Sequence, residues 1–209
     1  MHSSPNLKNW IINSPNIATN NQKIGILGGS FNPAHDGHIE ISNHAIKKFD
    51  LDFIWWVISP KNPLKTYDRL YDFNERLDKA KSIVHNNKII VTEIEQKIGS
   101  QYTIGTINYL TKKHPNTKFI WIMGADNAKD FHLWKKWESI LGMLPIAIID
   151  RPRSSLDVTS SLFAIKHKKY RIDEADSQMV FKIKKPSWVY LHNKLNDSSS
   201  TKIRSNDKI

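Results

Sequence analysis

Short apolar segments alternate along this chain with segments of helical periodicity, and this alternation restricts the fold more than any other feature. The strand-length apolar segments comprise residues 23–27, 53–58, 88–94, 118–123 and 145–150. Between them, apolar residues recur at helical spacing in residues 37–49, 73–85 and 103–114, and we expect a further helix near 162–169. The apolar segments themselves show little alternation, as expected of strands that helices cover on both faces. The pattern predicts βαβ units and therefore an α/β fold with a parallel sheet.

The loops of such a sheet indicate where a ligand would bind. In a Rossmann-like, doubly wound parallel sheet, ligands bind beyond the carboxyl ends of the strands, near the point where the strand order reverses. The loops that follow the five predicted strands are residues 28–38, 59–65, 99–103, 124–126 and 151–152. We therefore expect a single site assembled from several of these loops.

The first loop has the most specific sequence in the chain, Gly-Gly-Ser-Phe-Asn-Pro-Ala-His-Asp-Gly-His at residues 28–38. Glycines allow backbone N–H groups to approach a phosphate closely, and the start of the following helix adds partial positive charge. His35 and His38 are then placed to donate to phosphate oxygens. A zinc site is the alternative, but the chain has no cysteine and no acidic residue at a spacing that completes the ligands. The loop also differs from the GxxxxGK[ST] and GxGxxG motifs.

Composition limits the class of protein. The 209 residues, 39% of them hydrophobic, suffice for one α/β domain, which we expect at 23–209 after an Asn- and Ser-rich tail at 1–22. Cysteine is absent, and no apolar run approaches the roughly 20 residues of a membrane span. We expect a cytoplasmic protein with no membrane partner. The net charge of +11 comes from scattered lysines, which indicates a generally basic surface that would also suit highly phosphorylated substrates. We expect small-molecule partners and no nucleic acid.

Residues 28–38 resemble the G-G-[ST]-F-[DN]-P-x-H-x-G-H signature of the nucleotidylyltransferase superfamily. Further segments, at 101–103, 124–126, 133–137 and 199–204, are similar to those of its bacterial nicotinate-nucleotide adenylyltransferase family. The resemblance implies a nucleotidylyltransferase-type fold and transfer of the adenylyl group of ATP to nicotinate mononucleotide, which gives deamido-NAD and pyrophosphate in NAD biosynthesis. It also implies that Mg²⁺ arrives with ATP and has no protein ligand.

Several alternatives stay open at this stage. The acceptor could be nicotinamide mononucleotide or phosphopantetheine, and a non-catalytic basic protein that binds nucleotides or nucleic acid is a more distant possibility. The sequence also leaves open whether the chain is a monomer or a homo-oligomer.

The resemblance assigns the ATP side of the site to the first loop and to residues 199–204. His35 and His38 match the histidines that contact the triphosphate. The other residues implied on this side are Gly28, Gly29, Ser30, Phe31, Asp126, Ser199, Ser200, Thr201 and Arg204. Hydroxyls at 199–201 can cap a helix and Arg204 can clamp two phosphate oxygens, although such a segment is also typical of a disordered tail. Asp126 could equally be an N-cap.

The acceptor side is implied by two aromatic segments. Tyr102 and Thr103 match the residues whose backbone amides receive the nicotinate carboxylate, and Trp134 matches the tryptophan that stacks on the pyridine ring. A cationic pyridinium over an indole gains roughly 0.5–2 kcal/mol. We expect residues 131–137 to lie on an amphipathic helix, where either Trp134 or Trp137 could instead be core. The basic residues implied at the pocket are Lys65, Arg76 and Arg151.

Overall fold

The computed structural model describes residues 21–61, 63–64, 69–150, 158–183 and 186–193. In this part of the chain, seven strands form one sheet in the order β3-β2-β1-β4-β5-β7-β6, with every neighbouring pair parallel. The strands are β1 (Lys23–Gly29), β2 (Phe53–Ile58), β3 (Ile89–Thr92), β4 (Lys118–Gly124), β5 (Ile146–Ile149), β6 (Arg171–Ile172) and β7 (Trp188–Leu191). The order reverses between β1 and β4, so the predicted doubly wound parallel sheet is confirmed.

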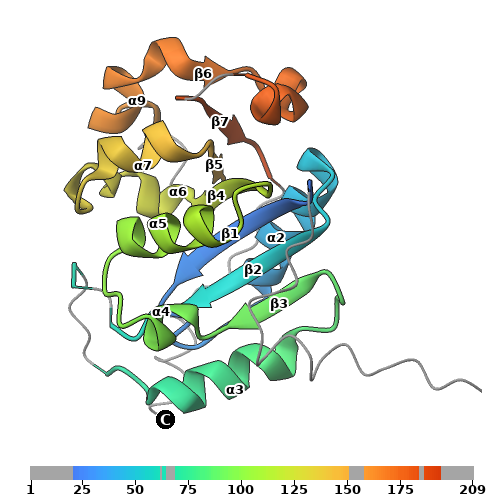
Figure 1. Cartoon of the computed structure of the whole chain (residues 1–209), viewed down its shortest axis with the longest axis vertical. Coiled ribbons are helices and arrows are strands. Elements are labelled where there is room, and N and C mark those ends of the chain that lie inside the picture. Colours follow the sequence, from blue (N-terminus) through green and yellow to red (C-terminus); the bar gives the residue numbers. More distant parts are fainter. Residues whose placement is uncertain (1–20, 62, 65–68, 151–157, 184–185, 194–209) are drawn as a thin grey trace, which may run out of the picture.

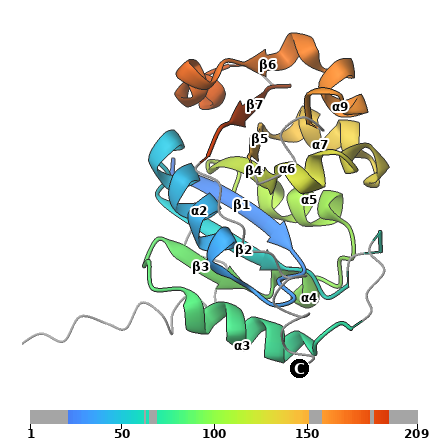
Figure 2. The same cartoon turned by 180° about the vertical axis from the view of Figure 1, so that it is seen from behind.

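Helices cover both faces of the sheet (Figure 1). The helices are α2 (Asp36–Phe49), α3 (Phe73–Ile83), α4 (Ile94–Lys97), α5 (Thr103–Lys113), α6 (Ala125–Ala128), α7 (Trp137–Met143) and α9 (Leu162–Lys166), with 3-10 turns η2 (Phe131–Leu133), η3 (Lys168–Tyr170) and η4 (Glu174–Phe181). Helices α4 to α7 lie in front of the sheet in Figure 1, whereas α2 and α3 lie in front in Figure 2.

The core consists of two apolar layers, one on each face of the sheet. Within β1, Ile24 and Ile26 belong to the layer under α5 and α7, whereas Leu27 belongs to the layer under α2 and α3. Because both faces are covered, the central strands are apolar on both sides, which accounts for their lack of polar alternation.

The predicted elements are present, with three corrections. The expected strand at 88–94 is shorter, Ile89–Thr92, and α4 begins at Ile94. The expected helix at 162–169 ends at Lys166 and is followed by η3. Sequence reasoning missed β6 and β7, although the residues Trp-Val-Tyr-Leu of β7 form a strand-length apolar run. The boundary of the expected tail at residue 22 stays a prediction, because residues 1–20 lie outside the described residues.

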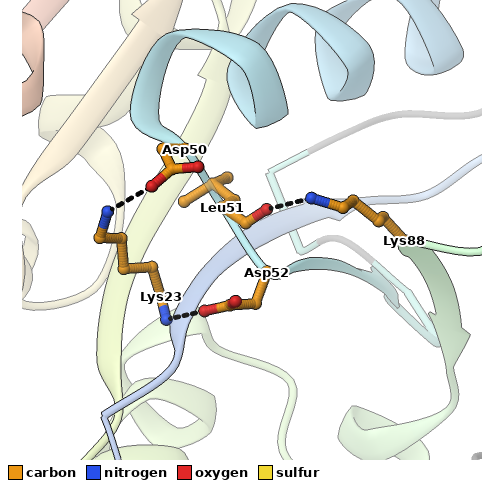
Figure 3. Close-up of polar contacts among 5 residues, drawn as sticks. All are labelled: Lys23, Asp50, Leu51, Asp52 and Lys88. Atoms are coloured by element: carbon orange, nitrogen blue, oxygen red, sulfur yellow. Dashed lines mark hydrogen bonds and ion pairs between the residues drawn. The ribbon is translucent and has the colours of Figure 1, made fainter.

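The amino ends of the strands are joined by charged residues at the surface (Figure 3). The Lys23 ammonium donates to the Asp50 carboxylate at 2.9 Å, and the Lys23 backbone N–H donates to Asp52 at 2.8 Å. Lys88 donates to the Leu51 carbonyl at 3.1 Å. The hydrogen bond from Lys23 lowers the pKa of the Asp50 carboxyl. These contacts fasten the turn between α2 and β2, and no predicted site residue lies among them.

Candidate active site

Helix α2 begins at the two histidines of the first loop. His35 is its N-cap, and the His35 Nδ1 accepts a hydrogen bond from the Gly37 N–H at 3.1 Å. The His38 Nδ1 accepts from the His35 N–H at 3.3 Å, which completes a reciprocal capping box. The histidine spacing therefore serves the helix start itself, because each ring satisfies one N–H group that the first turn would otherwise leave unpaired.

These two hydrogen bonds decide the tautomer of each ring. An Nδ1 that accepts a hydrogen bond carries no proton, so the neutral ring has its proton on Nε2. Both Nε2 atoms are then donors, as contact with a phosphate requires. The rings are 4.0 Å apart between centroids, and His35 and His38 are only 5% and 9% exposed. The capping box thus holds two ring donors together at the carboxyl end of β1.

Aromatic and hydroxyl contacts hold the His38 ring in place. The Phe31 ring lies 4.6 Å from it and stacks on Trp56, whose own centroid is 5.8 Å from His38. The Trp56 Nε1 donates to the Ser42 hydroxyl at 2.7 Å, and that hydroxyl donates to the His38 carbonyl at 2.8 Å. Phe31 has φ 45°, a conformation that is uncommon outside glycine. Sequence reasoning missed Trp56 and Ser42, which contact the ring and the backbone carbonyl of His38.

Gly28 has a packing role that the sequence did not indicate. A Cβ atom at Gly28 would lie 2.5 Å from the Trp121 ring of the neighbouring strand β4. At Gly29, a Cβ would lie 3.3 Å from the Phe31 ring. The absence of a side chain at Gly28 therefore lets the indole of Trp121 lie across β1. The predicted phosphate contact of Gly28, Gly29 and Ser30 stays a prediction beside this role.

Asn32 connects the first loop to the segment before α3. Its Oδ1 accepts from the Tyr71 N–H and its Nδ2 donates to the Arg69 carbonyl, both at 2.9 Å. An ionised aspartate could make only the first of these bonds, because it has no donor. Asparagine, which the signature given above allows beside aspartate at this position, is therefore matched to the conformation of residues 69–71.

Arg76 is a buried anchor of loops and does not present its charge at the surface. The side chain is 1% exposed. Its guanidinium donates to the carbonyls of Ser30 at 2.6 Å, Ser59 at 2.8 Å, Pro60 at 2.9 Å and Tyr71 at 3.0 Å. The expectation that Arg76 lines the pocket as an open basic group is thus wrong, because these carbonyls occupy its donors.

The start of α5 brings the two predicted acceptor segments together. Tyr102 is the N-cap and is 39% exposed, and Thr103 is the first helical residue. The Ser100 hydroxyl donates to the Tyr102 carbonyl at 2.9 Å, which shapes the turn. Lys135 lies over the Tyr102 ring, with its ammonium 4.3 Å from the centroid. Because Lys135 follows Trp134 in the chain, this contact brings the segment of Trp134 beside the start of α5.

The expected amphipathic helix at 131–137 is wrong. The 3-10 turn η2 ends at Leu133, Trp134 is extended with ψ 140°, and α7 begins only at Trp137 after Lys136 with φ 54°. The half-buried Trp134 packs edge-on against Trp121 at 6.0 Å. Trp121 in turn lies against Gly28, so a continuous packing path connects the first loop with Trp134.

The two tryptophans have different surroundings. Trp137 packs edge-on against Phe131, Phe163 and His167, with centroids 5.2–6.3 Å away. Those contacts join α7 to α9, on the side of the sheet distant from β1. Trp134 is the tryptophan adjacent to the predicted acceptor segment, and its stacking on a pyridine ring stays a prediction.

Asp126 lies at the carboxyl end of β4, as expected, on the short helix α6. The N-cap of α6 is Gly124, so the alternative role of Asp126 as an N-cap is wrong. Its side chain is exposed. Exposure at this edge is compatible with the implied contact to the nucleotide, which stays a prediction.

Glu95 is a buried acid that sequence reasoning missed. It lies on α4, is 4% exposed, and accepts a hydrogen bond from the Thr106 hydroxyl at 2.9 Å. Burial raises the pKa of Glu95 to about 7. The available signal in the sequence was its position directly after the third strand, at the same edge of the sheet as the other site residues.

The remaining predicted site residues are Lys65, Arg151, Ser199, Ser200, Thr201 and Arg204, and they lie outside the described residues. Within the described ranges, no group of three or more His, Asp or Glu side chains is arranged to hold a metal ion. In the same residues, no helix has both the length and the apolar character needed to cross a membrane.

The fold and the geometry at the carboxyl edge of the sheet indicate a class of nucleotide-binding protein. A doubly wound sheet presents a helix start with two ring donors after its first strand, at the point where the strand order reverses. Such a position suits the phosphates of a nucleotide. The model of the cytidylyltransferase-like family matches residues 26–206.

Curated relatives make the class narrower. A probable nicotinate-nucleotide adenylyltransferase of Agrobacterium fabrum is 42% identical over 185 residues, which cover 88% of this chain and 99% of the relative. A protein of the same name from Rhizobium meliloti is 39% identical over 182 residues, covering 87% and 97%. The chain therefore belongs to the nicotinate-nucleotide adenylyltransferase family, within the cytidylyltransferase-like nucleotidyltransferases.

A solved structure shares the fold. The Plasmodium falciparum nicotinic acid mononucleotide adenylyltransferase complexed with NaAD has a TM-score of 0.65 and 23% sequence identity, with 88% of this chain and 83% of that chain covered. The likeness supports the α/β architecture.

Proposed function

We propose that this chain transfers the adenylyl group of ATP to nicotinate mononucleotide and forms deamido-NAD and pyrophosphate, a step of NAD biosynthesis. The observation that carries this proposal is the capping box of His35 and His38, in which both Nδ1 atoms accept from backbone N–H groups at the carboxyl end of β1. The names of the relatives support the choice of acceptor.

The chemistry needs little from the protein beyond position and charge. A phosphate oxygen of the acceptor attacks the α-phosphorus of ATP, a new O–P bond forms, and the bond from the α-phosphorus to the bridging oxygen breaks. The bridging oxygen leaves with pyrophosphate and keeps the electron pair. The attacking oxygen is already anionic, so no general base is required, and catalysis comes from alignment and from donors to the developing charge.

On the ATP side, the two histidines would donate to phosphate oxygens that gain charge as pyrophosphate leaves. ATP enters as a complex with a divalent cation, and we propose Mg²⁺. Ser199, Ser200, Thr201 and Arg204 would complete the phosphate contacts, and Gly28, Gly29, Ser30, Phe31 and Asp126 would line the nucleotide. Neutral Nε2–H groups suit this task because they donate without adding a charge that product release must overcome.

On the acceptor side, the start of α5 would receive the nicotinate carboxylate. The amides of Tyr102 and Thr103 lie at the positive end of an 11-residue helix, which favours an anion. A carboxylate satisfies such donors, whereas a carboxamide presents one donor of its own there, so the acid is preferred over the amide. Trp134 would stack on the pyridine ring, with Lys65 and Arg151 near the acceptor phosphate.

A pyrophosphate-release assay tests this proposal. The purified chain is given ATP with Mg²⁺ and either nicotinate mononucleotide or nicotinamide mononucleotide, and the products are identified by mass. We expect kcat/KM to be higher with the acid by roughly a hundredfold or more, because a carboxamide places an N–H group where the two backbone amides need an acceptor. Equal rates with the two acceptors would contradict the assigned acceptor, and activity with phosphopantetheine alone would replace it.

A further inference from the structure

Ser59, at the carboxyl end of β2, is the shared partner of two buried side chains of opposite charge. Its carbonyl accepts from the Arg76 guanidinium at 2.8 Å, and its hydroxyl lowers the pKa of the Glu95 carboxyl, against the larger rise that burial causes. Arg76 lies on α3 and Glu95 on α4, which pack on opposite faces of the sheet. We call Arg76, Ser59, Glu95 and Thr106 the Ser59 network.

The ends of the Ser59 network reach both sides of the candidate active site. At one end, Arg76 donates to the Ser30 carbonyl in the first loop. At the other end, Glu95 accepts from the hydroxyl of Thr106, one helical turn after Thr103. The Ser59 N–H also donates to the Gly29 carbonyl at 2.8 Å. The network therefore connects the first loop with the start of α5 through polar side chains that are buried or partly buried.

Burial gives these bonds their importance. Arg76 and Glu95 are both nearly inaccessible, and charged groups are costly to bury unless every donor and acceptor is matched. Hydrogen bonds depend on direction, so a buried network specifies one relative placement of the segments, whereas apolar contacts tolerate sliding. Burial raises the pKa of Glu95 to about 7, and the hydroxyls of Thr106 and Ser59 counteract that rise.

We propose that the Ser59 network positions the acceptor-binding start of α5 relative to the first loop, residues 28–38. Glu95 and Thr106 are then positioning residues for the acceptor. This inference rests on the proposed function. Transfer between two bound substrates requires the attacking oxygen to lie about 3–3.5 Å from phosphorus, and a displacement near 1 Å can lower the rate about a hundredfold. A network that spans both binding segments controls this distance without touching either substrate.

Removal of single hydroxyls tests the network. Thr106→Val removes the hydroxyl that binds Glu95, and Thr106→Ser keeps it. The matched control is Thr111→Val, because the Thr111 hydroxyl, on the same helix, bonds the carbonyls of Ile107 and Asn108 in its own helix. For Thr106→Val we expect kcat/KM for the acceptor to fall roughly tenfold or more while the ATP KM changes less than about twofold. Thr106→Ser and Thr111→Val should behave as wild type.

A double variant tests whether Ser59 and Thr106 act through the same acid. We expect Ser59→Ala combined with Thr106→Val to impair the reaction less than the two single effects predict together, because both hydroxyls serve Glu95. Fully additive effects, a Thr111→Val variant as impaired as Thr106→Val, or an ATP KM that rises in parallel would overturn the network. A wild-type chain that ignores nicotinate mononucleotide would instead overturn the proposed function, and the variants would then be compared with the acceptor it uses.

Discussion

The two edges of the sheet use charged residues in opposite ways. At the amino edge, Lys23, Asp50 and Lys88 join neighbouring turns at the surface, with the Asp50 side chain 80% exposed (Figure 3). At the carboxyl edge, the charges of Arg76 and Glu95 are buried and matched by carbonyl and hydroxyl groups. Both edges connect the same parallel strands, so the difference does not arise from topology.

The difference teaches where this fold needs exact placement. Water weakens the attraction between exposed charges and can replace either partner, so an exposed ion pair specifies position poorly. Buried hydrogen bonds are costly to leave unmade, so they hold the segments in one arrangement. Substitutions at the carboxyl edge should therefore alter catalysis and stability, whereas substitutions at the amino edge should do neither.

The largest effect is expected at the paired histidines. His38→Ala removes one ring donor and should lower kcat by roughly 10²–10³, the usual effect of losing one donor to developing charge. Steady-state kinetics measure the effect of the missing donor on turnover, and a thermal unfolding curve shows whether the variant is still folded. His85→Ala, at an exposed position after α3, is the control and should keep wild-type turnover. Wild-type turnover in His38→Ala would remove the histidine from the chemistry.

The second effect concerns stability. Arg76→Met leaves four buried or partly buried carbonyl partners without their donor, so we expect the free energy of unfolding to fall by roughly 3 kcal/mol or more. Urea unfolding at constant slope measures this loss. Lys112→Met changes an exposed basic residue on the surface of α5 and should stay within about 0.5 kcal/mol of wild type. If Arg76→Met lowers the free energy of unfolding by only about 0.5 kcal/mol, then water molecules donate to the four carbonyls in place of the guanidinium.

The third effect depends on pH. Folding raises the pKa of Glu95 from 4.5 to about 7, so the folded protein holds its proton more tightly than the unfolded chain. The stabilising contribution of protonated Glu95 is complete below pH 4.5 and is lost as the pH rises to about 7. Glu95→Gln cannot ionise, so its stability relative to wild type should increase over this interval by roughly 2–3 kcal/mol.

Unfolding curves at several pH values measure this difference. Glu75→Gln is the control, because Glu75 is exposed and pairs with Lys79 on the surface of α3. Its stability relative to wild type should not follow the same curve. A pH-independent difference between Glu95→Gln and wild type would show that Glu95 does not titrate in this range.

The fourth effect separates two neighbouring aromatic residues. Trp134→Ala should raise the acceptor KM by a factor that corresponds to roughly 0.5–2 kcal/mol of lost cation–π energy and leave the ATP KM unchanged. Trp137→Ala should instead lower the unfolding temperature, because Trp137 packs against Phe131, Phe163 and His167. If the acceptor KM rises only in Trp137→Ala, then Trp137 stacks on the pyridine ring and Trp134 has the packing role.

The smallest effect is expected at the amino edge. Asp50→Asn removes one charge of the Lys23 pair and suits the left-handed backbone at this position, where φ is 51°. The lowered pKa of Asp50 means that its contribution exists above pH 3.8 and disappears as the pH falls through the lowered value. At neutral pH, kcat and the unfolding temperature should match wild type at high salt. Reduced turnover in Asp50→Asn would contradict the conclusion that only the carboxyl edge of the sheet affects catalysis.

Some of the site could be predicted and some could not, for physical reasons. The alternation of elements revealed the doubly wound sheet, and the loop at 28–38 revealed the histidine pair, because both depend on residues close in sequence. The helix expected at 131–137 was wrong because Trp134 is extended between η2 and α7, where it packs against Trp121. Glu95 and Ser59 escaped notice because their partners are 11 and 17 residues away or more.

The sequence by itself determined the order of elements and the chemistry of the first loop. Glycine, asparagine and histidine in 28–38 specify a turn and a helix start through local backbone preferences and short-range hydrogen bonds. Only the tertiary structure decided that Gly28 makes room for Trp121 and that Arg76 and Glu95 meet at Ser59. These features depend on burial and on contacts between distant segments, which exist only once the sheet has formed.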